Sequence, residues 1–71
     1  MNATISRQGD IAYLIVTHSI EQAIEFKIDC GDLIQSVEMV LGDGDPSLSD
    51  EQWIMGSFDG IDAHVYRINY R

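Results

Sequence analysis

The sequence predicts a small α+β domain in which an antiparallel sheet of about five strands carries one packed helix, with the elements in the order β-β-β-α-β-β. Three patterns support this fold class. Residues 11–18 are rich in β-branched and aromatic side chains, residues 24–30 alternate in polarity, and apolar residues recur at helical spacing over residues 32–42. A chain of 71 residues has the length of one domain, so residues 1–71 are expected to share one core.

The helix is predicted over residues 32–42 and is expected to organise the packing of the chain. Apolar residues there recur at i, i+1, i+4, i+7 and i+8, which gathers them into one stripe about 120° wide. Asp32 and Gln35 have the spacing of a capping box, and Gly42 stands where a left-handed residue would end the helix. Met39 falls on the opposite face and is expected to be exposed. The stripe consists of Leu33, Ile34, Val37, Val40 and Leu41.

Two strands are predicted before the helix, joined as a hairpin. Gly9 and Asp10 form a turn signal between a short polar segment, residues 3–8, and the apolar run of residues 11–18. Because that run is nearly continuous, it is predicted to be the central strand of the sheet, covered on at least part of both faces.

The segment after this hairpin has two interpretations. Ser19 with Gln22 resembles a capping box, whereas residues 24–30 alternate as a strand does. Since the alternation extends over seven residues, it outweighs the helical spacing. We therefore predict a turn over residues 19–22 and a third strand over residues 23–29.

The segment after the helix, residues 43–52, is rich in Gly, Pro, Ser and Asp and is predicted to be a loop, with one helical turn starting at Ser47 or Ser49. Its oxygen-bearing residues alternate as in a calcium loop. The sixth and twelfth positions of that motif, however, hold Leu48 and Ile54 in place of Gly and Glu. A solvated acidic loop is therefore expected rather than a metal site.

A second hairpin is predicted at the end of the chain. Residues 53–58 form its first strand, Asp59 and Gly60 form a type I′ turn, and residues 61–70 form the return strand. The apolar residues of that return strand change parity near Tyr66, which predicts a switch of the buried face through either a bulge or an extension of the strand beyond the sheet.

The chain is strongly acidic, with twelve Asp and Glu against four Lys and Arg and a formal charge of −8. No Lys or Arg occurs between Ile28 and Tyr66, although nine of the acidic residues lie there. Nucleic-acid binding needs cations against phosphates, so direct nucleic-acid contact is not expected. A negative field suits a basic partner, and the same acidity would also serve solubility alone.

No catalytic or cofactor motif is present, and a non-enzymatic protein without cofactor or metal is expected. His18, Cys30 and His64 lack the short spacing of a zinc site and are expected to be strand-end histidines and a core-facing cysteine. One cysteine cannot form an internal disulfide, which favours a reducing compartment. No apolar run approaches the ~18 to 20 residues of a membrane span, and no signal peptide is evident. A soluble cytoplasmic protein that does not bind membranes is predicted.

The candidate partner-binding residues are carboxylates on predicted loops and turns, together with the single tryptophan, because tryptophan is enriched in protein interfaces. Carboxylates on adjoining loops can face one way at phosphate-like separations. The set is Asp43, Asp45, Asp50, Glu51, Trp53, Asp59 and Asp62.

In size, acidity, single-domain α+β organisation and lack of catalytic motifs, the chain resembles the small acidic phage-encoded inhibitors that include the anti-CRISPR proteins. The resemblance covers the whole chain loosely. It implies a stoichiometric inhibitor that acts in the host cytoplasm as a nucleic-acid mimic and occupies the positively charged surface of a basic protein or nucleoprotein. The alternative is a small structural or regulatory interaction protein, a homodimer formed through an exposed strand edge and Trp53.

Overall fold

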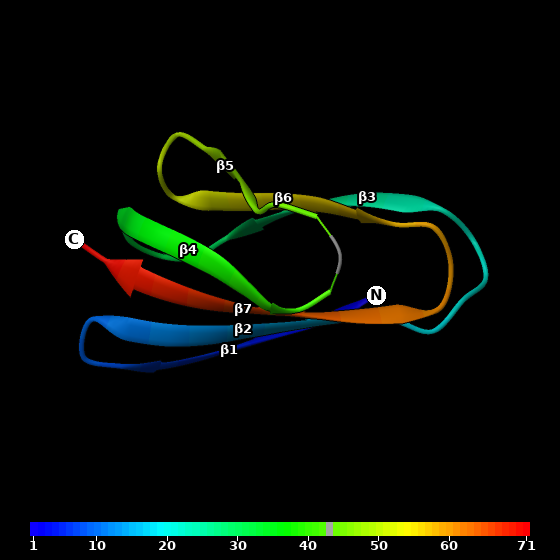
Figure 1. Cartoon of the computed structure of the whole chain (residues 1–71), viewed down its shortest axis with the longest axis horizontal. Coiled ribbons are helices and arrows are strands. Elements are labelled where there is room, and N and C mark those ends of the chain that lie inside the picture. The colour runs from blue at the N-terminus through cyan, green and yellow to red at the C-terminus, as the bar shows by residue number, and fades with distance from the viewer. Residues whose placement is uncertain (43) are drawn as a thin grey trace.

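The computed structural model describes residues 1–42 and 44–71, and this part of the chain forms seven strands in two antiparallel sheets, with no helix. The first sheet has the order β1-β2-β7-β4 and the second has the order β3-β6-β5; the two sheets face each other across a common core (Figure 1). The predicted α+β fold with one packed helix is therefore wrong. The strands are β1 (Asn2–Gln8), β2 (Ile11–His18), β3 (Ile24–Asp29), β4 (Ile34–Leu41), β5 (Ser47–Ser49), β6 (Trp53–Phe58) and β7 (Asp62–Tyr70).

The predicted helix is strand β4, which pairs with β7. Two register shifts, between Ile34 and Ser36 and between Met39 and Leu41, interrupt this pairing. The first shift separates the inward-facing Ile34 and Val37 by three residues, a spacing that a helix also shows. The rest of the helical pattern comes from apolar residues of β4 that do not face the core.

The predicted apolar stripe is divided between the core and the solvent. Ile34 is buried and Val37 packs against the core, whereas Val40 and Leu41 are more than half exposed. Met39, predicted to be exposed, packs against the core instead. The β-branched residues of this segment favour a strand once a neighbouring strand can pair with it.

The predicted first hairpin is confirmed, because β1 and β2 pair in full register around Gly9 and Asp10. Gly9 has a φ of 63°, as the first position of a type II′ turn requires. β2 pairs with β1 on one side and β7 on the other, so it lies inside the sheet as predicted. Its burial alternates strictly, however, and Tyr13 and Ile15 on its outer face are exposed, contrary to the expected cover of both faces.

The strands predicted over residues 23–29 and 53–58 are confirmed as β3 and β6, and residues 47–49 form strand β5 in place of a helical turn. Asp59 and Gly60 do not form a hairpin turn, because β6 belongs to the second sheet and β7 to the first. β6 already has β3 on one side and β5 on the other, which leaves no free edge for β7. The connection between β6 and β7 is therefore a corner between the sheets.

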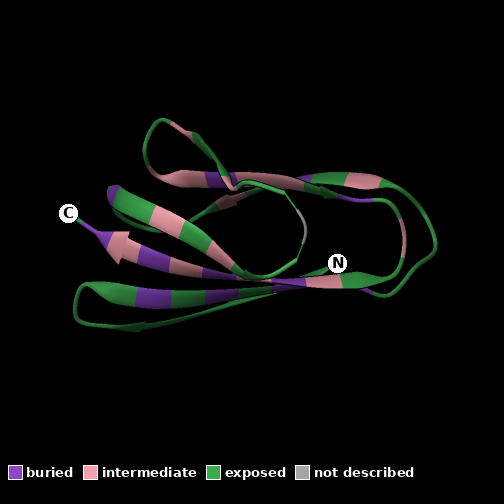
Figure 2. Cartoon of the chain, viewed as in Figure 1, coloured by how far each residue is buried: buried purple, intermediate pink, exposed green. Residues whose placement is uncertain are grey.

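Strand β7 buries the same face along its whole length, so the predicted switch near Tyr66 is wrong. The pairing of β7 with β2 has no register shift, and the extra residues in its pairing with β4 lie in β4. Alternation of buried and less buried positions is visible along β2 and β7 in Figure 2. The buried apolar residues, drawn from both sheets, are Ala12, Leu14, Val16, Phe26, Cys30, Ile34, Ile54, Phe58, Tyr66, Ile68 and Tyr70.

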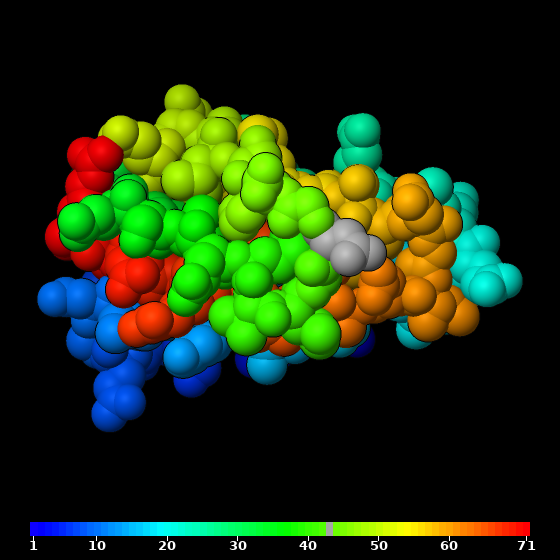
Figure 3. Space-filling view, in the orientation of Figure 1, coloured from blue at the N-terminus to red at the C-terminus, as the bar shows by residue number. Residues whose placement is uncertain are grey.

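The molecule is elongated, with extents of 35 × 21 × 18 Å, and its two ends differ. The β1–β2 turn, the β5–β6 turn and the C-terminus lie at one end, here called the hairpin end (Figure 1). The β2–β3 connection, residues 19–23, and the β6–β7 connection, residues 59–61, lie at the other, here called the corner end. The tip of the β1–β2 hairpin, in blue, projects from the hairpin end in the space-filling view (Figure 3).

Candidate protein-binding surfaces

The structure does not bring the predicted binding residues together. Asp50 and Glu51 form the β5–β6 turn at the hairpin end, whereas Asp59 and Asp62 flank the β6–β7 connection at the corner end. Asp45 is exposed just before β5, and Asp43 lies outside the described residues. Because the longest dimension is 35 Å, the two groups cannot contact one small partner site together.

The four Lys and Arg residues all lie on the half of the molecule nearer the hairpin end, and three of them form ion pairs there. Arg71 pairs with Glu51 at 2.5 Å, and the other two arginine pairs are longer, at 3.5 Å. Exposed ion pairs add little stability, but they cancel much of the negative charge at this end. The two longer pairs are Arg7 with Asp32 and Arg67 with Glu38.

The β5–β6 turn is fixed by hydrogen bonds rather than free for a partner. The backbone carbonyl of Glu51 accepts from the amide of Ile34 at 2.6 Å. The side chain of Gln52 donates to Asp29 at 2.8 Å, and this bond, together with one from the backbone amide of Gly31, lowers the pKa of Asp29. Asp50 and Glu51 have φ values of 52° and 55°, so the turn holds two non-glycine residues in the left-handed region. The backbone of this turn is therefore held in place, while the Asp50 and Glu51 side chains remain exposed.

Trp53 lies on the outer face of β6, the central strand of the second sheet, and is half-buried. The Lys27 ammonium lies 5.1 Å from the centre of its ring, a cation–π contact that covers part of the indole. β1 belongs to the other sheet, so Trp53 and the β1 edge do not form one surface.

The corner end carries acidic side chains without Lys or Arg. Glu21 comes from the β2–β3 connection, while Asp59 and Asp62 come from the β6–β7 connection and the start of β7. All three are exposed. Among the described residues, the amino group of Met1, next to the Asn2–Thr17 pair, is the cationic group on this half. We call Glu21, Asp59 and Asp62 the acidic corner.

A buried aromatic cluster packs next to the connections that carry the acidic corner. The Phe58 ring lies between two buried histidines, with its centre 5.6 Å from that of His18 and 4.4 Å from that of His64. His18 Nε2 lies 2.8 Å from the carbonyl oxygen of Gln22, and His64 Nδ1 lies 3.2 Å from the Tyr66 hydroxyl. These contacts join both connections to the core, so the backbone that carries the acidic corner is held by close packing.

Sequence reasoning missed Glu21 and the meeting of the two histidines. It predicted isolated histidines at strand ends and Cys30 facing the core. The position of His18 at the end of β2 and the burial of Cys30 are confirmed, whereas His64 is the third residue of β7 and both histidines pack against Phe58. Their proximity depends on how the chain passes between the sheets, for which the sequence carries no local signal. A lone glutamate in a predicted turn likewise gives no sign of which other turn lies beside it.

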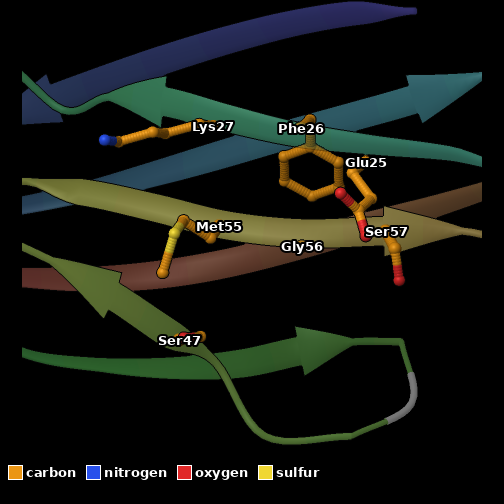
Figure 4. Close-up of a pocket in the computed structure, with 7 residues that line it drawn as sticks. All are labelled: Glu25, Phe26, Lys27, Ser47, Met55, Gly56 and Ser57. Carbon is orange, nitrogen blue, oxygen red and sulfur yellow. The ribbon is translucent and has the colours of Figure 1, made fainter.

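A surface hollow of about 480 Å³ lies on the outer face of the second sheet. Glu25 and Ser57 lie at one end of it and Lys27 and Met55 at the other (Figure 4). It is open to solvent and its lining contains no histidine or cysteine. Within residues 1–42 and 44–71, no three His, Cys, Asp or Glu side chains converge as a metal ion would require.

No helix in the described part of the chain is long and apolar enough to cross a membrane. Comparison of the chain with protein-family models, with curated protein sequences and with solved structures found no match.

Proposed function

We propose that the chain is a non-enzymatic binding protein whose acidic corner docks on a positively charged surface of another protein. The observation that carries this proposal is the segregation of charge along the molecule. All four Lys and Arg residues lie on the half nearer the hairpin end, and the acidic corner has none beside it. Acidity that served solubility alone would not need this separation.

The length of the molecule makes the separation effective. Charges interact over a screening length of about 8 Å at physiological ionic strength. The long axis is 35 Å, so cations at the hairpin end scarcely reduce the field at the corner end. Such a field steers a basic partner toward one end of the molecule and raises the association rate.

The partner chemistry that fits is a surface rich in Lys and Arg, as on proteins that bind nucleic acid. A rigid group of carboxylates can occupy such a surface in place of phosphates, which is the inhibitory action that the resemblance to phage-encoded inhibitors implies. With the helix replaced by a strand, that resemblance rests on size and acidity. Occupation of a basic groove, rather than any chemical step, is the proposed mode of action.

Two double variants with the same change in net charge test the proposal. Asp59→Lys with Asp62→Lys reverses the acidic corner, and Asp10→Lys with Asp50→Lys makes the same change at the hairpin end. The probe is a fluorescent oligoarginine peptide, titrated at about 0.05 and about 0.3 M salt, where screening differs strongly. Circular dichroism and urea unfolding confirm that each variant is folded.

We expect the corner variant to lose at least tenfold more affinity than the hairpin-end variant, and wild-type binding to weaken steeply with salt. Equal losses in the two variants would show that net charge alone governs binding, which would overturn the proposal. Proteins retained from a lysate by the wild type but not by the corner variant would then be tested individually for inhibition.

A further inference from the structure

Strand β1 differs from the other sheet edges because nothing protects it from pairing. An edge strand presents unpaired backbone groups, and proteins usually block such edges with charge, bulges or shortness. Among the edges formed by the described residues, β4 contains two register shifts, β3 carries Glu25, Lys27 and Asp29 on its outer face, and β5 has three residues. β1 extends over seven residues without a bulge in its pairing with β2, and its sequence contains no proline.

Arg7, the one charged side chain of β1, does not block pairing along the edge. Arg7 lies on the inner face, with its guanidinium carbon 3.9 Å from the centre of the Tyr70 ring. Its Nε donates to the carbonyl of Gly9 at 2.9 Å, and it pairs with Asp32. The guanidinium is thus held on the inner side of the sheet, and residues 2–6 of the edge carry no charged side chain.

β1 is also uncovered on its faces. The second sheet has three strands against four, and every residue of β1 is exposed. Ile5 lies opposite the buried Leu14, so it points to the inner side of the sheet, yet it is 43% exposed. An apolar side chain on the inner side of an edge strand remains without neighbours until another strand is added.

The hairpin geometry fixes which amides of β1 face outward. In the two-residue turn, the carbonyl of Gln8 bonds to the amide of Ile11, so the even-numbered residues of β1 bond to β2. The amides and carbonyls of Ala3, Ile5 and Arg7 therefore point away from the sheet. These are the groups that an added strand would meet.

We propose that two copies of the chain pair through β1 in an antiparallel manner and form one continuous eight-stranded sheet. The full-length register pairs Asn2 with Gln8 of the second copy, and places Ile5 opposite Ile5. Arg7 then faces Ala3, so no like charges oppose each other across the new ladder. This proposal does not depend on the function assigned to the acidic corner.

Charge identifies a second copy as the occupant. Two molecules of formal charge −8 repel each other across most of their surfaces, but residues 1–9 contain no acidic residue. Asn2 lies toward the corner end and Gln8 at the hairpin end, so antiparallel pairing sets the corner end of one copy beside the hairpin end of the other. The two acidic corners therefore point away from each other.

Sedimentation velocity tests the proposal with two variants matched in residue type and exposure. Ile5 on β1 is 43% exposed and Ile15 on the outer face of β2 is 45% exposed. We expect a dimeric wild type, a monomeric Ile5→Lys variant, in which two lysines would oppose each other, and a dimeric Ile15→Lys variant. A monomeric wild type at its highest soluble concentration would overturn the proposal, and so would loss of the dimer in Ile15→Lys alone, which would place the contact on the outer face.

Amide exchange and crosslinking test the pairing itself. We expect the outward amides of Ala3, Ile5 and Arg7 to become protected as protein concentration rises, whereas they would exchange rapidly in a monomer. In a Cys30→Ala background, Ile5→Cys is expected to form an intermolecular disulfide with copper phenanthroline, because directly paired residues have Cα atoms about 5.5 Å apart. Unprotected outward amides at all concentrations, or crosslinking of Ile15→Cys in preference to Ile5→Cys, would refute edge pairing.

Discussion

Tyr70 joins the last strand to the connection between β3 and β4, and removal of its hydroxyl tests how much this joint contributes to stability. The hydroxyl donates a buried hydrogen bond of 2.8 Å to the carbonyl of Cys30. The ring is 3% exposed and lies under the guanidinium of Arg7. Tyr70→Phe removes the donor and retains the ring, so packing and the cation–π contact should stay unchanged.

The expected loss of stability in Tyr70→Phe follows from the Cys30 carbonyl, which stays buried without a hydrogen-bond donor. A buried acceptor left without its donor costs about 1 to 3 kcal/mol. For a domain of 60 to 100 residues, each kcal/mol changes the melting temperature by about 4 to 8 °C. A central loss of about 2 kcal/mol therefore predicts a melting temperature lower by roughly 8 to 16 °C. That is a large share of the stability expected for so small a domain.

The assay is urea unfolding followed by tryptophan fluorescence, with thermal melts by circular dichroism. The control is Tyr13→Phe, because Tyr13 is 45% exposed and its loss should change the free energy of unfolding by less than about 0.5 kcal/mol. The slope with urea should be the same in all three proteins. Equal unfolding midpoints for Tyr70→Phe and Tyr13→Phe would refute the structural role of this hydrogen bond.

Three further perturbations discriminate features of the fold. Gly56→Ala would place a Cβ 2.5 Å from an atom of the Phe26 ring and should lower the free energy of unfolding in urea by about 1 to 3 kcal/mol. The control is Gly60→Ala, whose Cβ meets nothing within 4 Å, and equal stability of the two variants would contradict this. Val37→Asp should abolish the cooperative thermal transition, while Val40→Asp, at a position 57% exposed, should leave it nearly unchanged, whereas a helix would bury both. The free energy of unfolding should fall as pH rises above about 8.5, because burial raises the pKa of three acidic groups that are neutral in the folded state. Their contribution to stability is complete below their unfolded pKa values and is lost as the pH rises through their folded pKa values. Urea midpoints that stay constant to about pH 11 would contradict this. The three acids are Cys30, Tyr66 and Tyr70.

The strands that the sequence could predict are those with a clear local pattern. An unbroken period of two indicated β3, and a run of β-branched and aromatic residues indicated β2; the bounds of both agree closely with these patterns. β4 could not be recognised in this way, because its register shifts interrupt the period of two and its exposed Val40 and Leu41 complete an apolar spacing that a helix also shows. The error at Asp59 and Gly60 has a different origin. A local turn signal cannot show that β6 is already flanked by β3 and β5.

The candidate site was harder to predict than the strands. Acidity and the absence of Lys and Arg over a long stretch indicated a basic partner, but they did not show that Asp50 and Asp59 lie at opposite ends. Glu21 and Asp62 lie at the same end of the molecule only because the β2–β3 and β6–β7 connections both occur there. Such proximity is a property of topology, and single residues in turns do not encode it locally.

The position of β7 in the first sheet has a consequence for the order in which the protein can fold. β7 follows the other six described strands in the chain, yet both β2 and β4 pair with it, and Ile11 lies opposite Asn69. Before β7 docks, the first sheet consists of a hairpin and a separate strand, and the inner face of β2 has no stable cover. Pairing partners so distant in sequence close slowly, in the range of milliseconds to seconds for β proteins of this kind. A nascent or truncated chain without β7 would therefore expose an aggregation-prone strand edge, and refolding yield should depend on how quickly this last strand is captured.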